Sequence, residues 1–392
     1  MINRRSLRIK AFKNLYAYES CKGANYLMAL DLIDKKFTPD LNSMEVIDKT
    51  DLERKRKLAR TEFEKRYHPD DETSQEVIDE EIETELKETY RYLERQNQSD
   101  LKKLSKDLHN EATRVLRDQL LVLSLLEEFA FLNKKISDEK KSLANVLGER
   151  AQVRTNLYEN KIIEKISKNE AFQKLKTEYK ISWANDEDNL RSWYKGILNK
   201  DETYREYNKK ESTNYEEDWV ILDYICRSII FKNDVFSGFF EDLDLDWIDN
   251  KPIVRSLVLK SLKSAKGEED AFQMADISYN WEDDSEYVQE LFKLTIKEDS
   301  YLEELLKKRL QNWDIDRVAL TDRILLKMAL AEMLYFPSIP TKVTINEFIE
   351  ISKTFSTPKS KKFVNGILDG LSVDLKDKGL IKKSGRGLLD NK

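Results

Sequence analysis

The segment that most constrains the fold is an apolar stretch near the carboxyl end, residues 318–334, which two prolines follow. Apolar side chains occupy nearly every face of this stretch, a pattern typical of a helix buried inside a bundle. Pro337 and Pro340 end the helix and force an extended connection, because proline lacks a backbone N–H and restricts the residue before it. We therefore expect a central helix here, with other helices packed around it.

Two further helix starts come after the prolines. Thr344 lies three residues before Glu347, and this spacing predicts a capping box at the start of a helix. Thr357-Pro358 predicts the next start, with a capping residue followed by proline in the first turn. The stretch from Trp313 to about Leu371 is therefore expected to hold three consecutive helices.

The last of these helices carries Phe363, Ile367 and Leu371 on one face, which predicts that this face is buried. Gly366 lies in the same helix. A glycine inside a helix costs about 1 kcal/mol relative to alanine, so we expect another element to approach the backbone closely at Gly366.

Three motifs run through this region in a fixed order and spacing: Asp322-Arg323-x-Leu325-x-Lys327-x-Ala329-x-x-Glu332, Ile339-Pro340-x-x-Val343-x-Ile345-Asn346-Glu347 and Phe363-Val364-Asn365-Gly366-Ile367-Leu368-Asp369. Together they resemble the carboxyl-terminal half of the transcription antitermination factor NusB. The resemblance covers roughly residues 284–373 and the amino-terminal helix. It implies an all-α protein, with a NusB-like helical bundle and a large helical insertion that the resemblance does not explain.

Composition agrees with a helical protein. The 392 residues include 10 Gly and 6 Pro, and 36% are charged, so helix breakers are scarce and the length suits two or three domains. No apolar run is long enough to span a membrane, and no apolar core follows Met1 as a signal peptide would require. Cys21 and Cys226 are too few and too far apart for a disulfide framework, which fits a reducing cytoplasm.

The amino-terminal segment combines a basic start with an apolar face. Its basic residues precede the first acid, and its apolar residues recur at helical spacing: Arg4, Arg5, Arg8, Lys10 and Lys13, with Leu7, Ala11, Leu15 and Tyr18. A solvated amphipathic helix is one interpretation. The resemblance implies another, because the first helix of NusB begins with arginines, continues into an Ala/Leu-Tyr segment and contributes to RNA binding. On that basis we expect Arg4, Arg5, Arg8 and Tyr16 to bind RNA, with the arginines on the exposed side.

Further site residues are expected in the carboxyl-terminal region. Lys359, where the family often has an acid, and Lys362 add positive charge to the expected RNA-binding set. Asp322 and Glu332 are expected on a partner-binding outer side of the bundle. The resemblance implies that the ligand is the boxA element of ribosomal RNA leaders, bound with the ribosomal protein NusE in an antitermination complex on RNA polymerase. The alternative is a helical interaction scaffold that has lost RNA binding, which the net charge of -6 favours.

The expected domains divide the chain into four parts. Residues 1–21 form the first helix of the NusB-like domain, 22–280 a helical insertion of which 22–99 is partly flexible, 281–375 the bundle and 376–392 a basic flexible tail. Within the insertion we expect a loosely ordered segment at 41–50, a long helix at 100–135, a turn at 247–252 and a helix at 253–262. Trp183 and Trp193 are expected to make core or interface contacts. Another helix, at 287–305, is expected to enter the bundle.

One further segment is similar to a known motif. Tyr67-His68-Pro69-Asp70 is similar to the loop of J-domain cochaperones. The Tyr-x-x-Leu-Gly segment expected upstream is missing, and acidic residues follow instead of lysines. We therefore do not expect a J-domain.

No catalytic chemistry is indicated. The two histidines, His68 and His109, lie far from either cysteine, so they predict no zinc site, and no glycine-rich phosphate-binding loop is present. NusB-like modules also precede RNA cytosine methyltransferase domains, but here only residues 375–392 follow the module. We expect neither an enzyme nor a cofactor or metal.

Overall fold

The computed structural model describes residues 1–39, 48–67, 79–147, 153–310 and 317–391. These residues form sixteen α-helices joined by turns and short 3-10 and π segments, with no strand among them, which confirms the all-α expectation. No helix of the described ranges is both long and apolar enough to cross a bilayer. Most of the segment expected to be loosely ordered, the tripeptide His68-Pro69-Asp70 and the residues from Asn312 to Asp316 lie outside the described residues.

The chain forms two compact units. The first unit holds residues 110–282 with 1–3, and the second holds residues 4–109 with 283–392. The expected helix at 100–135 is wrong in its continuity, because α3 (Glu80–His109) ends and α4 (Glu111–Val146) begins on either side of Asn110. The sequence does not show this break, since buried Leu108 and Val115 keep helical spacing across it.

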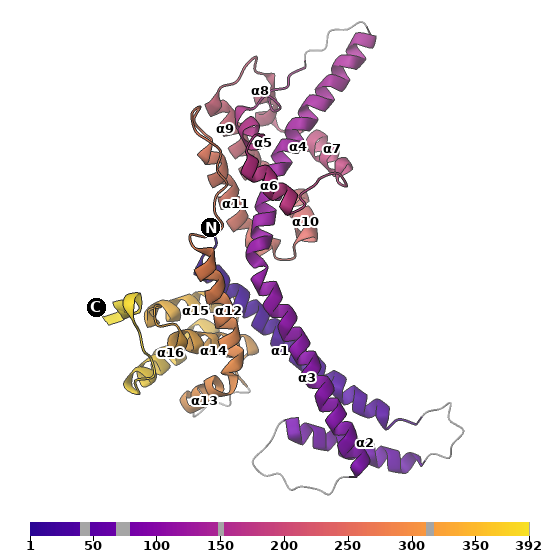
Figure 1. The fold of residues 1–392 in the computed structure, drawn as a ribbon, viewed down its shortest axis with the longest axis vertical. Helices are drawn as coiled ribbons and strands as arrows, with labels where there is room; N and C mark the ends of the chain where they lie inside the picture. The colour runs from indigo at the N-terminus through magenta and orange to yellow at the C-terminus, as the bar shows by residue number, and fades with distance from the viewer. Residues whose placement is uncertain (40–47, 68–78, 148–152, 311–316, 392) are drawn as a thin grey trace. The chain divides into compact units, whose positions relative to one another are not determined.

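In the first unit, α4 is the longest helix and packs against α5, α6, α7 and α11 (Figure 1). Asn and Asp side chains accept hydrogen bonds from the first-turn N–H groups of five of the shorter helices: Asn160, Asn169, Asp201, Asn214 and Asn233. The remaining elements of this unit are α5 (Lys161–Ser167), α6 (Glu170–Glu178), α7 (Glu187–Gly196), η1 (Leu198–Lys200), α8 (Glu202–Lys209), α9 (Tyr215–Tyr224), η2 (Ile225–Ile230), α10 (Asp234–Leu243) and α11 (Trp247–Ser264).

Large aromatic side chains fill the core of the first unit. Trp183 and Trp193 are buried, as expected, with ring centroids 6.2 Å apart. The predicted turn at 247–252 is wrong, because α11 begins at Trp247 and has Pro252 inside it. Trp247 is fully buried and stacks on Phe240 at 4.4 Å, and this packing outweighs the proline signal.

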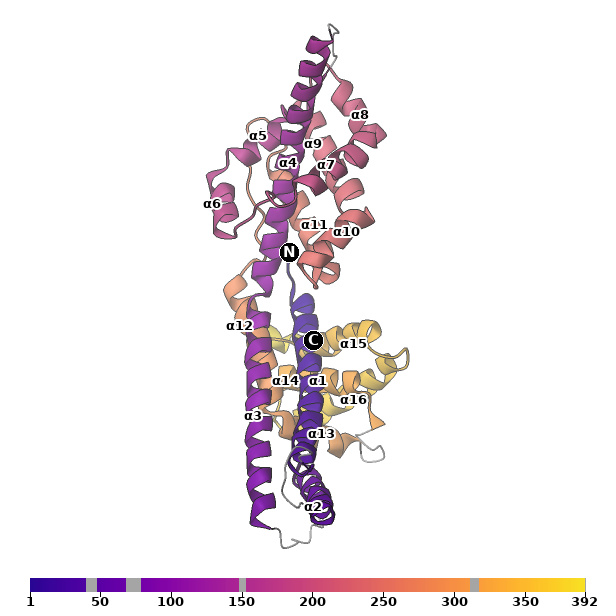
Figure 2. The same ribbon diagram turned by 90° about the vertical axis from the view of Figure 1, so that its right-hand side faces the viewer.

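The second unit has its own core between three helices. The long helix α1 (Arg4–Lys36) lies beside α3, with α2 (Lys49–Tyr67) packed against both (Figure 1, Figure 2). Phe63 is fully buried at the centre of this cluster, and its ring centroid lies 5.7 Å from that of Tyr26 and 4.8 Å from that of Tyr90.

The rest of the second unit is a bundle around α14 (Leu320–Tyr335), with α1, α13, α15 and α16 in contact with it (Figure 1). Every residue from 324 to 333 is buried, which confirms the central helix expected at 318–334. The helix expected at 287–305 is two helices with Glu298 between them. The surrounding elements are α12 (Trp281–Lys297), α13 (Asp299–Arg309), α15 (Thr341–Phe355), α16 (Ser360–Asp377) and η4 (Gly385–Asn391).

Two local predictions in the bundle are wrong. The helix α15 starts at Thr341, with Pro340 at the capping position, so Thr344 lies inside the helix and forms no capping box. On α16 the fully buried face is that of Val364, Leu368 and Leu371, while Phe363 is half-buried. Proline, with its fixed φ, is suited to the position before the first residue of a helix. The Thr344 hydroxyl donates to Glu332 instead of capping the helix.

The predicted close approach at Gly366 is also wrong. A Cβ there would meet nothing within 4 Å, whereas a Cβ at Gly370 would lie 2.0 Å from the guanidinium of Arg309. Gly370 is therefore the glycine of this helix that admits a neighbouring side chain.

Candidate nucleic-acid interface

A buried ion pair joins the first helix to the bundle. Arg8 Nε and Nη2 donate to the two carboxylate oxygens of Glu332 at 2.7 and 2.9 Å. The two side chains are 3% and 0% exposed. Burial alone lowers the pKa of the Arg8 guanidinium, but the neighbouring Glu332 carboxylate more than offsets this and raises it above its usual range. The Arg8 guanidinium is therefore charged, and both side chains are held in place by the two hydrogen bonds.

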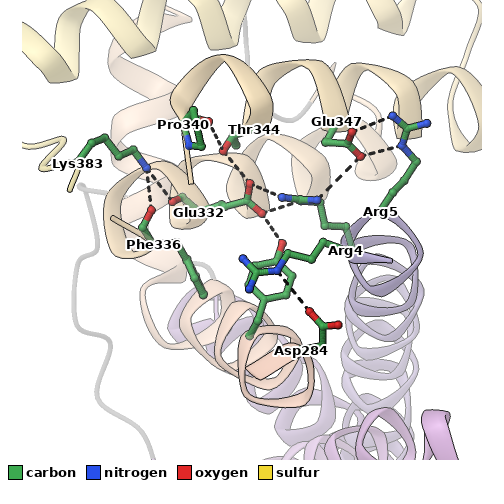
Figure 3. A network of polar contacts seen from close by, with 11 residues as sticks. Arg4, Arg5, Asp284, Glu332, Phe336, Pro340, Thr344, Glu347 and Lys383 are labelled. Carbon is green, nitrogen blue, oxygen red and sulfur yellow. Dashed lines mark hydrogen bonds and ion pairs between the residues drawn. The ribbon is translucent and has the colours of Figure 1, made fainter. Parts of the chain in front are cut away.

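Two hydroxyl groups complete the shell of Glu332. Thr344 Oγ1 donates to Glu332 Oε1 at 2.7 Å (Figure 3). The Tyr287 hydroxyl donates to Glu332 Oε2. Burial raises the pKa of Tyr287 well above its ordinary value, and the Glu332 charge adds to this. Glu332 thus accepts hydrogen bonds from side chains of α1, α12 and α15. We call this buried group of Arg8, Tyr287, Glu332 and Thr344 the joint, because its hydrogen bonds connect four helices.

The other two amino-terminal arginines also face acids. Arg5 donates to both oxygens of Glu347 at 2.7 and 2.8 Å, and this hydrogen bonding lowers the pKa of Glu347 below its ordinary value (Figure 3). Arg4 pairs with Asp283 at 2.6 Å and with Asp284 at 3.4 Å. The basic start of the chain is therefore largely neutralised within the second unit.

These contacts change the expected roles of the arginines. The expectation that Arg8 lies on the exposed side is wrong, because its side chain is 3% exposed and its guanidinium is engaged by Glu332. Arg5 remains about half exposed and Arg4 about one-third exposed. The structure thus leaves Arg5 the most accessible of the three, while Arg8 holds the helix that carries it.

Asp322 and Glu332 are both buried, so the expectation that they lie on the outer side of the bundle is wrong. Asp322 Oδ2 accepts a hydrogen bond from Ser360 Oγ at 2.6 Å. Ser360 Oγ in turn lies 3.0 Å from Ser356 Oγ. Asp322 therefore ties the start of α14 to the α15–α16 turn, and the partner-binding surface itself stays a prediction.

The exposed face of this region lies around that turn. The ring centroid of Phe12 on α1 lies 5.4 Å from that of Phe355 at the end of α15, and 6.5 Å from that of Tyr16. Tyr16, which is 44% exposed, therefore lies near the segment that leads into α16. Three exposed lysines follow on this segment: Lys359, Lys361 and Lys362.

These three lysines, named here the α16 lysines, are exposed and close together in the sequence, which favours anion binding. Among the described residues no carboxylate comes within ion-pair distance of them. Lys361 is not among the site residues expected from the sequence, although it is exposed like Lys359 and Lys362. A tyrosine beside several free ammonium groups can stack on an unpaired base while the cations hold phosphates.

Comparison with known proteins gives the family. The NusB family model matches residues 253–372. The chain is 36% identical over 111 residues to the transcription antitermination protein NusB of Natranaerobius thermophilus, a match that covers 28% of this chain and 78% of that protein. The chain belongs to the NusB family.

Other NusB proteins show the same partial coverage. The NusB of Salinibacter ruber is 44% identical over 104 residues, and that of Chloroherpeton thalassium is 53% identical over 85 residues. These matches cover 26% and 22% of this chain, and they span 65% and 40% of the two relatives. A solved structure of T. maritima NusB aligns with 41% of this chain and 92% of that chain, with 25% identity and a TM-score of 0.24.

The NusB motifs supply the acids that hold the first helix. Glu332 closes the first motif and binds Arg8, and Glu347 closes the second and binds Arg5. Sequence reasoning missed Tyr287 as part of the joint, and Asp283 and Asp284 as partners of Arg4, since no motif marks them. Tyr287 lies at helical spacing inside α12 and reads as an ordinary core residue.

The tail also contacts the NusB-like bundle. Lys383 Nζ donates to the carbonyl oxygens of Phe336 at 3.0 Å and of Glu332 at 3.5 Å, at the carboxyl end of α14 (Figure 3). A cation at this end of a helix is favoured by the helix dipole. The Lys383 side chain therefore contacts the bundle. From composition alone, a lysine in this basic carboxyl-terminal segment would be expected in solvent.

Proposed function

We propose that this chain is an RNA-binding transcription antitermination factor that binds boxA-type leader RNA. The observation that carries this proposal is its membership of the NusB family through a match to a protein named for transcription antitermination. We further propose that it acts in the cytoplasm with the ribosomal protein NusE, inside an antitermination complex on RNA polymerase. The role is one of binding, not catalysis.

The proposed RNA contacts are exposed groups at the α15–α16 turn together with Arg5, which is paired with Glu347 on α15. The α16 lysines and Arg5 hold phosphates, and Tyr16 stacks on an unpaired base. Arg4 supports the same edge from its pairs with Asp283 and Asp284. Arg8 acts indirectly, because its buried pair with Glu332 fixes the helix that presents Tyr16.

The proposed NusE surface is the outer side of the bundle. Asp322 and Glu332 support it from inside, since both carboxylates are engaged in hydrogen bonds between helices. With a net charge of -6 and a largely neutralised basic start, the chain alone should bind RNA only modestly. NusE would extend the basic surface, so that RNA crosses both proteins.

A second candidate function is an interaction scaffold that has lost RNA binding. The specific observation in its favour is that each amino-terminal arginine is paired with an acid of the same unit. A salt-titrated binding assay with boxA RNA and a scrambled RNA separates the two candidates. The antitermination role predicts a preference for boxA, whereas equal and weak binding of both RNAs supports the scaffold.

Calorimetry with NusE tests the coupling. If RNA crosses both proteins, NusE raises the affinity for RNA, and RNA must raise the affinity for NusE by the same factor because coupling between binding sites is reciprocal. Equal RNA affinity with and without NusE would contradict the cooperative arrangement.

A further inference from the structure

A strongly basic pocket lies in the first unit, outside the residues that the NusB family model matches. It has a volume of about 710 Å³, within the range of ordinary ligand sites. Among the described residues, its lining includes five cationic side chains and no carboxylate: Lys140, Arg154, Lys195, Arg205 and Lys209. In a chain with a net charge of -6, such a concentration of positive charge points to an anionic ligand.

Three helices build the pocket and supply four of its five cations, and Arg154 lies between α4 and α5. Lys140 comes from α4 and Lys195 from α7, while Arg205 and Lys209 lie four residues apart on one face of α8. Arg154 forms one loose pair, with Glu211 at 3.7 Å. The other four cations have no carboxylate within ion-pair distance among the described residues. Their charge is therefore available to a ligand.

A network of buried polar side chains lies beside the pocket, and two of its members, Asn133 and Tyr194, line it. Asn133 Nδ2 donates to the Tyr194 hydroxyl at 3.0 Å, and the Tyr194 and Tyr204 hydroxyls lie 2.9 Å apart. Asn133, Tyr194 and Tyr204 are all buried, so the network fixes α4, α7 and α8 to one another. The cations on these helices are thus held around a preformed cavity.

The lining also offers an acceptor without a partner. Asn208 lines the pocket, and its buried Oδ1 has no hydrogen-bond partner in the described part of the chain. A buried acceptor of this kind is destabilising until it meets a donor. A simple anion offers acceptors only, whereas a ribonucleotide offers phosphates for the cations and hydroxyl or amino donors for Asn208.

We propose that this pocket binds the sugar–phosphate backbone of single-stranded RNA, as a second RNA site in the first unit. Successive phosphates would engage the cations of α7 and α8, and a ribose hydroxyl or base amino group would donate to Asn208. The preference for RNA over an acidic peptide rests on the proposed function. The pocket would contribute affinity that does not depend on base sequence.

The test uses the full chain and a fluorescein-labelled uridine oligonucleotide that lacks a boxA sequence. In one variant Lys195, Arg205 and Lys209 are replaced by Gln. In the matched control, Lys174, Lys232 and Lys263 are replaced by Gln, because these lysines are exposed in the same unit and do not line the pocket. Circular dichroism should show the same helical content in both.

The plot of log affinity against log salt concentration has a negative slope, to which each single-strand phosphate contact contributes about 0.7. Loss of three contacts should therefore make the slope shallower by about 2. The control should bind like the unmodified chain. The oligonucleotide should also bind more tightly than uridine monophosphate, since several phosphates reach several cations. Equal affinity for the two ligands would overturn the proposal of a backbone site.

Two other results would also overturn it. One is unchanged RNA affinity and slope in the pocket variant. The other is loss of binding to a polyglutamate peptide, but not to RNA, in that variant. The test is separate from that of the proposed function, because preference for boxA over scrambled RNA does not depend on a sequence-independent pocket.

Discussion

The Arg8 guanidinium and the Glu332 carboxylate form a two-pronged ion pair that is removed from solvent, although 324 residues separate them in the sequence. The pair fastens the first helix of the chain to the central helix of the NusB-like bundle. Tyr287 and Thr344 satisfy the same carboxylate from two further helices. The joint therefore depends on four elements at once.

Breaking this joint should be costly. Arg8→Ala leaves the Glu332 charge buried without its partner, and such changes cost about 3–5 kcal/mol of unfolding free energy. Arg5→Ala is the control, because the Arg5 side chain is about half exposed and its pair with Glu347 should be worth about 1 kcal/mol or less. Denaturant melts measure both. Equal losses in the two variants would contradict the structural role given to Arg8.

Alanine substitutions at Leu325 and Phe363, which both belong to the NusB motifs, should lower the free energy of unfolding by different amounts. Leu325 is fully buried, so Leu325→Ala should cost about 2–5 kcal/mol through the cavity it leaves. Phe363 is half-buried, and Phe363→Ala should cost less. Leu27, which is 62% exposed, gives the surface control, with an expected change of about 0.5 kcal/mol or less. A larger loss for Phe363 than for Leu325 in urea melts would contradict this assignment.

Two glycines should respond in opposite directions to alanine. Gly366 lies inside α16 with open space around it, so Gly366→Ala should stabilise the protein by about 0.5–1 kcal/mol. A Cβ at Gly387 would lie 2.0 Å from the backbone oxygen of Pro337, so Gly387→Ala must displace the tail. Thermal melts and hydrogen exchange near Ser384 report on the two variants. A neutral Gly387→Ala would mean that the tail does not pack there.

Some features of the fold are set by the residues of a single segment. The central helix α14 follows from its own apolar pattern, and burial of Trp183 and Trp193 follows from their size. The break at Asn110 could not be predicted, because helical spacing continues across it. The apolar periodicity of a segment predicts which helix face is buried. It does not predict the residue at which one helix ends and the next begins.

The candidate site was less predictable than the fold. The amino-terminal basic cluster reads as free charge because the first acid along the chain is Glu19. Its acids come from residues 279–342 positions away, such as Asp283 and Glu347. Burial of Arg8 has the same origin, since only the tertiary fold brings Glu332 to it. Counting charges along a sequence therefore overestimates the cations available to RNA.

The Arg5–Glu347 pair should make stability depend on pH. Hydrogen bonding by Arg5 lowers the pKa of Glu347 below its ordinary 4.5 in the folded state. The stabilisation is therefore complete above 4.5 and is lost as the pH falls through the lower, folded-state pKa. Arg5→Ala should raise this pKa toward 4.5, as followed by carboxyl NMR titration. Arg60→Ala, which removes a pair with Asp34, is the control. An unchanged Glu347 titration in Arg5→Ala would contradict the coupling.

We propose that the exposed face at the α15–α16 turn binds boxA-type RNA, and a salt-titrated binding measurement tests this. Lys359, Lys361 and Lys362 are replaced together by Gln, and the control replaces Lys57, Lys102 and Lys106, which are exposed elsewhere in the second unit. We expect weaker boxA binding and a salt slope lower by about 2 for the α16 lysine variant, with an unchanged melt. If this variant instead binds boxA RNA with the affinity and slope of the control, the claim is contradicted.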